Sequence, residues 1–188
     1  SIVSEEEMTI SLQDIENILD TVECVNEPDV TFPQADSFDR IISLLEMLNN
    51  DTLKTKEEIT DEFKFDPRQT DYYFNAGKYL GFLTEDKIAV EENGKIIDKP
   101  AIRLSDRGKN LFNVKYKKRQ LEYVKAILEH QVFNQVLKDC IETFDMPCKA
   151  QIVIYMKEYL KRKYADQTYS RRASTISGWI NWILKLYE

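Results

Sequence analysis

Six polar side chains between residues 68 and 78 have the chemistry needed to contact a nucleic acid. Arginine pairs with guanine, Gln and Asn pair with adenine, and lysine contacts phosphate. The six residues recur at helical spacing and form one outward set: Arg68, Gln69, Asp71, Tyr72, Asn75 and Lys78. The competing interpretation is an ordinary solvated helix face, and the set taken alone favours that interpretation.

The outward set belongs to the second of two helices joined by a tight turn. Thr55 and Glu58 fit a capping box, which begins a short helix that ends near Phe63. Only residues 64–66 separate this helix from the next. Helix, tight turn and helix is the arrangement that can present a second helix to a DNA major groove.

The second helix has its own start and stop signals. Asp66, Pro67 and Gln69 supply an N-cap, a proline at the first helical position and an amide at the third. The helix is expected to run to about Leu80 and to stop at Gly81, a residue suited to a left-handed cap. Its buried stripe is predicted at Thr70, Tyr73, Phe74, Gly77 and Leu80.

A β-hairpin is predicted after these helices. Apolar residues from 82 to 90 indicate one strand, Asn93–Gly94 is a strong turn signal, and Lys95–Leu104 indicates the second strand. With a helix that begins at Ser37, the order is three helices and a ribbon, which is typical of a winged helix with its wing at residues 83–104. Lys95 and Lys99 are placed to touch phosphate or the minor groove, although Glu91 and Glu92 dilute their charge.

The charge of the chain is unevenly distributed. The formal charge is −7 over 188 residues, but residues 1–36 hold ten Asp or Glu and no Lys or Arg. The remainder therefore carries +3, and residues 149–188 carry +5. An acidic leader attached to a basic body is compatible with DNA binding.

The fold expected is mainly α with a small β wing, built as two winged-helix or helix-turn-helix domains in tandem. Residues 1–36 form an acidic leader, with a short helix at 11–22 and a linker at 26–36. Residues 37–114 form the first winged-helix domain. Residues 115–188 form a second, degenerate domain without a clear wing, with helices at 133–144, 150–162 and 169–186.

The second domain is predicted from a weak internal repeat with an offset of 103 residues. Arg68–Gln69 falls on Arg171–Arg172 in this superposition. The corresponding buried stripe is Ala173, Ile176, Ile180 and Ile183, and the corresponding outward set is Arg171, Arg172, Ser174, Thr175 and Asn181. Shared helical periodicity alone produces part of this similarity.

Several strings in the chain resemble a pair of winged-helix domains found in bacterial type II restriction endonucleases and related defence proteins. The strings are FPQADSFDRII, TKEEI, FDPRQTDYYFNAGKYLGFL, LSDRG and SRRASTISGWINWI. The resemblance implies a DNA-reading module beside a nuclease domain or subunit. A cytoplasmic location is expected separately, from the lack of an apolar run of membrane-span length and of a signal sequence. It also implies that DNA is read at Arg68, Gln69, Tyr72, Asn75, Arg171 and Arg172.

No catalytic residue, metal site or cofactor is predicted. His130 is the only histidine and is expected in a capping or surface role, and Cys24, Cys140 and Cys148 have no metal-binding spacing. Glu62–Lys64 and Glu85–Lys87 match the E-x-K fragment of restriction nucleases, but a chain this charged contains such matches by chance. The sequence leaves open whether the chain is part of an enzyme.

Four aromatic side chains have two interpretations. Tyr72, Tyr79, Trp179 and Trp182 can stack on bases, but Tyr79 and Trp182 follow the core stripe and are expected between helices.

The leading functional prediction is a sequence-specific module for double-stranded DNA. The alternative is a winged-helix protein-interaction module or a transcriptional regulator without a nuclease partner. A nuclease with an unrecognised site is the third and least favoured reading. No apolar run is long enough for a membrane span.

Overall fold

The computed structural model describes residues 8–50 and 52–188, and in it the chain divides into two compact units. Unit 1 comprises described residues 8–29, 36–38 and 114–188, and unit 2 comprises described residues 30–35 and 39–113. The acidic leader had been expected to stand apart, but its helix is part of unit 1. Residues 1–7 of that leader, and Asp51 at the predicted end of the helix from Ser37, lie outside the described residues.

Unit 2 is built on three short helices. These are α3 (Phe38–Met47, whose first residue groups with unit 1), α4 (Lys56–Phe63) and α5 (Pro67–Tyr79). The predicted start of α4 is confirmed in part: the Thr55 hydroxyl accepts a hydrogen bond from the Glu58 amide at 3.2 Å. In a complete capping box the Glu58 carboxylate would accept from the Thr55 backbone amide. Here the Glu58 carboxylate instead accepts from the Thr55 hydroxyl at 3.2 Å. 

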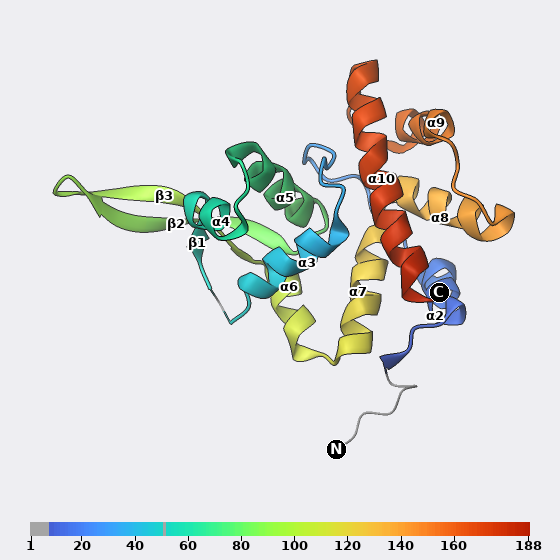
Figure 1. Cartoon of the computed structure of the whole chain (residues 1–188), viewed down its shortest axis with the longest axis horizontal. Helices are drawn as coiled ribbons and strands as arrows, with labels where there is room; N and C mark the ends of the chain where they lie inside the picture. The colour runs from blue at the N-terminus through green and yellow to red at the C-terminus, as the bar shows by residue number, and fades with distance from the viewer. Residues whose placement is uncertain (1–7, 51) are drawn as a thin grey trace. The chain divides into compact units, whose positions relative to one another are not determined.

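A small antiparallel sheet completes unit 2 (Figure 1). Its strands β1 (Lys54–Thr55), β2 (Leu83–Glu92) and β3 (Lys95–Leu104) lie in the order β1-β3-β2. The predicted hairpin is confirmed: Glu92 pairs with Lys95, and both turn residues, Asn93 and Gly94, have positive φ. Asn-Gly favours this turn because both residues tolerate the left-handed region.

Strand β1 had not been predicted from the sequence. Lys54 pairs with Ile102 and Thr55 pairs with Ala101. Two residues carry no alternating pattern, so only the partner strand reveals β1. The consequence is structural: β1 joins the start of α4 to the base of the hairpin, where Ala101 and Ile102 are buried.

A short connection leads from unit 2 to unit 1. Helix α6 (Asp106–Asn110) begins where predicted, because the Ser105 hydroxyl accepts from the Gly108 amide at 3.1 Å. The 3-10 turn η1 (Leu111–Asn113) follows.

Among the described residues of unit 1, the regular elements are all helices. It contains α2 (Leu12–Thr21), α7 (Tyr116–Leu128), α8 (Gln131–Thr143), α9 (Lys149–Tyr159) and α10 (Asp166–Leu186). An aromatic cluster fills its core: the ring of Trp179 stacks on Phe133 at 4.9 Å and meets the edge of Phe38 at 5.5 Å. Residues 114–188, all described, contain no strand, so the second half has no hairpin of the kind found in unit 2.

The coarse prediction of a mainly helical chain with a small antiparallel sheet is confirmed. Several helix boundaries differ from the prediction: α8 begins at Gln131 rather than at Phe133, α9 ends at Tyr159 rather than at Arg162, and α10 begins three residues earlier than expected. Among the described residues, none of the helices combines the length and apolar character needed to cross a lipid bilayer.

Candidate nucleic-acid interface

Helix α5 is held in place by the local signals that predicted it. The Asp66 carboxylate accepts from the Gln69 amide at 2.9 Å, and the Gln69 side chain accepts from the Asp66 amide at 3.1 Å. Lys64, with φ of 53°, turns the chain between α4 and α5. Gly81, with φ of 82°, ends the helix as expected. The capping role of Gln69 leaves its side chain committed to the backbone.

The predicted buried stripe of α5 is confirmed. Its members are all buried: Thr70, Tyr73, Phe74, Gly77 and Leu80. The hydroxyls of Thr60 and Thr70 are 2.6 Å apart and join α4 to α5. The ring of Phe65, in the turn, stacks on Tyr73 at 5.3 Å. The opposite side of α5 is therefore the side available to a ligand.

The outward set of α5 is only partly available. Arg68 is exposed on the first turn, and Tyr72 is half-buried. The Asn75 amide donates to the Thr31 carbonyl at 2.7 Å, so the linker at 30–35 covers this part of the helix. The Lys78 ammonium lies 2.8 Å from Glu85 on β2. To contact DNA, Asn75 would have to release the Thr31 carbonyl and Lys78 would have to release the Glu85 carboxylate.

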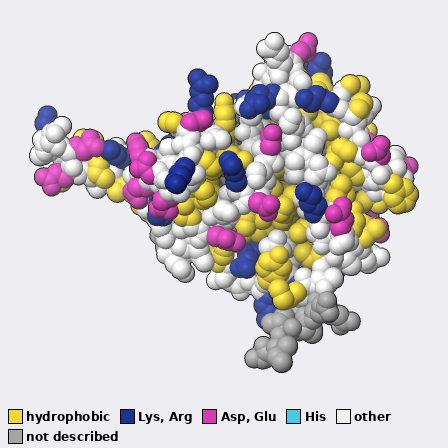
Figure 2. All heavy atoms as spheres, viewed as in Figure 1, with side chains coloured by type: hydrophobic (Ala, Val, Ile, Leu, Met, Phe, Trp, Pro, Cys, Tyr) yellow, Lys and Arg dark blue, Asp and Glu magenta, His cyan; other side chains and the backbone are white. Residues whose placement is uncertain are grey.

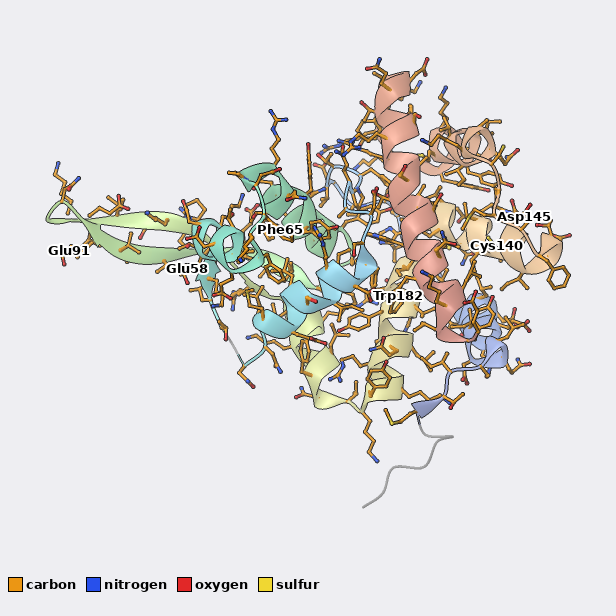
Figure 3. The ribbon with its side chains drawn as sticks, viewed as in Figure 1. Glu58, Phe65, Glu91, Cys140, Asp145 and Trp182 are labelled. Atoms are coloured by element: carbon orange, nitrogen blue, oxygen red, sulfur yellow. The ribbon has the colours of Figure 1, made fainter. Side chains whose placement is uncertain are left out.

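Ion pairs neutralise much of the positive charge around α5 and the hairpin. Lys56 pairs with Asp71 at 2.9 Å, and Lys99 pairs with Glu92 at 2.5 Å. The bond from Lys99 to Glu92 holds the pKa of Lys99 above its ordinary value. Lys95 is exposed beside the hairpin turn. Figure 2 shows basic and acidic side chains interspersed along the hairpin, and Figure 3 places Glu91 near its tip.

The predicted outward set of α10 is split by the structure. Arg171 is exposed, and Ser174 is half-buried. Thr175 was expected to face outward, but this placement is wrong: Thr175 is fully buried and its hydroxyl donates to the Asp36 carboxylate at 2.9 Å. The stripe itself is confirmed, since the predicted core residues are all buried: Ala173, Ile176, Ile180 and Ile183.

Asn181 lies at a different part of α10 from the two arginines. It lines a hollow of about 410 Å³ with Leu12, Cys140 and Phe144. Ten residues separate Asn181 from Arg171, which is about 15 Å along a helix. The grouping of these two side chains on one reading surface is therefore incorrect.

Arg172 stacks on an aromatic ring. Its guanidinium carbon lies 4.6 Å from the ring centre of Tyr164, in the turn before α10. Its Nε and Nη1 atoms are buried and have no hydrogen-bond partner. Arg172 is consequently held against the turn between α9 and α10, rather than extended from the helix as the repeat implied.

The turn between α9 and α10 carries basic residues that are not among the predicted DNA contacts. Lys161, Arg162 and Lys163 are all exposed there. Lys157, at the end of α9, has its ammonium 5.5 Å from the ring centre of Tyr169. The net charge of +5 over residues 149–188 indicates a basic region, but it does not show which residues within that region lie together.

The four aromatic candidates fall into two classes. Tyr79 and Trp179 are buried and cannot stack on bases. Trp182, labelled in Figure 3, is half-buried with its ring 4.4 Å from Phe38. Trp182 lies between helices as expected, since its ring meets Phe38 of α3 and Tyr123 of α7. Tyr79 is buried against Phe32 of the linker, and Tyr72 is the remaining candidate for stacking.

The side chains considered for catalysis are engaged in other contacts. His130 stands at the N-cap position of α8, although its side chain makes no cap hydrogen bond. The ring is buried, with Nδ1 3.0 Å from the Glu27 carboxylate, so the alternative surface role is wrong. Glu62 and Glu85 of the E-x-K fragments are ion-paired with Lys54 and Lys78. Within residues 8–50 and 52–188, no group of three or more His, Cys, Asp or Glu is arranged to hold a metal.

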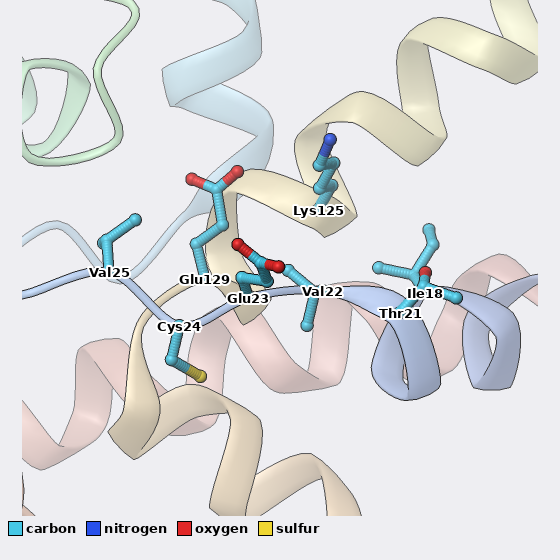
Figure 4. A pocket seen from close by; sticks show the side chains of 8 residues that line it. All are labelled: Ile18, Thr21, Val22, Glu23, Cys24, Val25, Lys125 and Glu129. Carbon is cyan, nitrogen blue, oxygen red and sulfur yellow. The ribbon is translucent and has the colours of Figure 1, made fainter.

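A polar hollow of about 480 Å³ lies at the end of α2 (Figure 4). Glu23, Lys125 and Glu129 line it with Cys24, whose thiol points toward the Leu128 carbonyl at 3.9 Å. Burial raises the pKa of the Cys24 thiol, so this thiol is a poor nucleophile.

Comparison with known proteins places the chain in a family without an assigned activity. Residues 40–188 match the family model described as a domain of unknown function, DUF7226. Because the match covers most of the chain, the chain belongs to this family. No curated protein and no solved structure shows a significant match to the chain.

Proposed function

We propose that the chain is a DNA-binding module in which residues 38–104 form a winged helix and α5 enters the major groove of double-stranded DNA. The observation that carries this proposal is the element order α3-β1-α4-α5-β2-β3, with β1 paired to β3. In a winged helix the same order positions the helix before the hairpin as the reading helix. Arg68 and Tyr72 are the side chains best placed to read bases on α5.

The proposal extends to α10 through Arg171. Helices α9 and α10, joined by the turn at residues 160–165, form the second helix-turn-helix. The hairpin contributes Lys95 as a phosphate contact. The restriction-system setting, with a nuclease domain or subunit as partner, belongs to the same proposal, and a nuclease or methyltransferase gene beside this one would support it.

The experiment is a binding titration of the parent chain and three variants on randomised duplexes, with selection of the bound sequences. Arg68→Ala and Arg171→Ala should each cost about 1–3 kcal/mol of binding and relax specificity at different base pairs. Lys95→Ala should weaken all sequences alike and lower the salt slope by about one. Lys185→Ala is the control for Arg171, since it lies about 21 Å further along α10. Equal binding by all variants with normal thermal melting would refute the reading role of both helices.

A second candidate is a protein-interaction module. Residues 52–104 hold eleven acidic and nine basic side chains, which is an unfavourable balance for polyanion binding. Ile96 is 79% exposed near the hairpin turn and offers an apolar contact to a partner. If the parent chain binds no duplex at any salt concentration in the titration, the protein-interaction candidate is favoured.

A further inference from the structure

The turn between α9 and α10 is rich in positive charge. Residues 157–172 include six basic side chains and only two acidic ones. The basic residues are Lys157, Lys161, Arg162, Lys163, Arg171 and Arg172. Figure 2 shows Lys and Arg side chains gathered near the beginning of α10. We call this group the turn cluster.

Two tyrosines give the turn cluster a fixed shape. Tyr164, in the turn, meets the edge of Tyr169 on α10 at 5.6 Å. Arg172 stacks on Tyr164, and Lys157 lies over Tyr169. The Nε and Nη1 atoms of Arg172 are buried without a hydrogen-bond partner, so Arg172 adds positive charge beneath the exposed side chains rather than a direct contact. Stacking thus holds both cations in place, and Lys157 also pairs with the Asp166 carboxylate at 3.4 Å.

The acidic leader already supplies one anionic ligand to the turn cluster. The Asp29 carboxylate accepts a hydrogen bond from Arg162 at 2.5 Å. This hydrogen bond, together with the nearby charges of Arg162 and Lys161, holds the pKa of Asp29 below its ordinary value. The Asp29 side chain is 77% exposed, so solvent reaches the pair and the carboxylate can be exchanged. A guanidinium recognises phosphate with the same geometry as carboxylate.

From this geometry we infer that the turn cluster is a binding surface for the phosphodiester backbone of duplex nucleic acid, and that Asp29 competes with phosphate for Arg162. The inference rests on the proposed function and names the surface that supplies its sequence-independent affinity. The exposed ammonium groups of Lys161 and Lys163 are point charges suited to phosphate, so this surface sets affinity and salt dependence.

The first arm of the test removes two positive charges from the turn between α9 and α10 in the full chain. The Lys161→Gln/Lys163→Gln variant changes two exposed side chains and should melt like the parent. Its salt slope on a randomised duplex should fall by about two, with affinity on the order of tenfold or more weaker at low salt. Lys185→Gln, on the same helix but outside the turn cluster, should leave the slope unchanged.

The second arm frees Arg162 from its carboxylate. Asp29→Asn should tighten duplex binding by about two- to fivefold at low salt. Asp20→Asn makes the same change of charge on the exposed side of α2 and should have no such effect. Equal behaviour of the two variants would overturn the competing role of Asp29.

The outcomes separate this inference from the proposed function. If Arg68→Ala weakens binding while the turn variant keeps the parent's affinity and slope, the turn cluster is not a phosphate surface and the proposed function stands. If the parent binds no duplex at all, both fail. Binding of the parent to anionic phospholipid vesicles, lost in the turn variant while duplex binding persists, would overturn the inference in favour of a membrane surface.

Discussion

Replacing Gly178 with alanine tests how the end of the linker is anchored on α10. A Cβ built on Gly178 lies 2.2 Å from the Asp36 carbonyl oxygen and 3.2 Å from its carbonyl carbon. Ordinary van der Waals contact begins at 3.4 Å, so one of the two backbones must move by about 1.2 Å. Both obstacles are main-chain atoms, which cannot rotate away as a side chain can.

The expected cost follows from three opposing contributions. Alanine in a helix interior gains about 1 kcal/mol over glycine. Overpacking of a close-packed contact costs about 1–3 kcal/mol. Displacing Asp36 also stretches the bond from the Thr175 hydroxyl, and hydrogen bonds to charged groups are worth about 1.5–3 kcal/mol. Gly178→Ala should therefore destabilise unit 1 by about 1–3 kcal/mol, although alanine has a higher helix propensity than glycine.

Urea unfolding followed by tryptophan fluorescence measures this change in unit 1. The chain has two tryptophans, Trp179 and Trp182, and both are in α10. Ser177→Ala is the matched control on the neighbouring residue and should change the stability by no more than about 0.5 kcal/mol. Gly178→Ala with equal or greater stability than the parent would show that Asp36 does not lie against α10.

Two further predictions concern titratable groups of unit 1. Burial raises the pKa of Cys140 to about 11, so its thiolate is scarce near neutral pH. Iodoacetamide should therefore modify the exposed Cys148 well before Cys140, and peptide mass spectrometry checks this order. Hydrogen bonds from Ser11, then the ion pair with Lys117, lower the pKa of Asp14. The stabilisation by Asp14 is thus present above its unfolded pKa and lost as the pH falls through the lowered folded pKa. Asp14→Ala should therefore cost about 0.5–1 kcal/mol at neutral pH, and this cost should shrink as the pH falls below 3.8, in the same fluorescence assay.

Features set by neighbouring residues in the chain could be predicted from the sequence. The caps of α5, its buried stripe and the Asn93–Gly94 turn each depend on residues within a few positions of one another. Such features have definite sequence signatures because the backbone groups they satisfy are local. The same holds for Ser105 at the start of α6.

Features set by distant partners could not be predicted. Thr175 lies about 100° from Ile176 on the helical wheel. It is buried, and Asp36, which is distant in sequence, lies against it. Asn75 has the residue type of a base-reading side chain, but the Thr31 carbonyl takes its amide. A helical wheel gives the centre of the buried stripe, whereas its width depends on which other segment covers the helix.

The same distinction applies to charge. The regional balance was read correctly from the composition, but a formal charge does not show which cations already have a carboxylate within reach. Lys78 of α5 and Lys99 of β3 count as basic residues. Each is paired with a carboxylate of β2, Lys78 with Glu85 and Lys99 with Glu92. The predicted phosphate contacts of the hairpin are therefore reduced in practice to Lys95.

On the proposed function, the two units contribute different parts of DNA recognition. Affinity for duplex DNA comes mainly from phosphate contacts, and specificity comes from contacts with base edges. Unit 2 presents Arg68 and Tyr72 on a helix whose surroundings are nearly neutral through ion pairs, which suits discrimination more than attraction. Unit 1 presents the turn cluster, where Lys157 pairs with Asp166 and Arg162 pairs with Asp29. The salt slope should accordingly follow substitutions at Lys161 and Lys163, and the selected sequence should follow substitutions at Arg68 and Arg171.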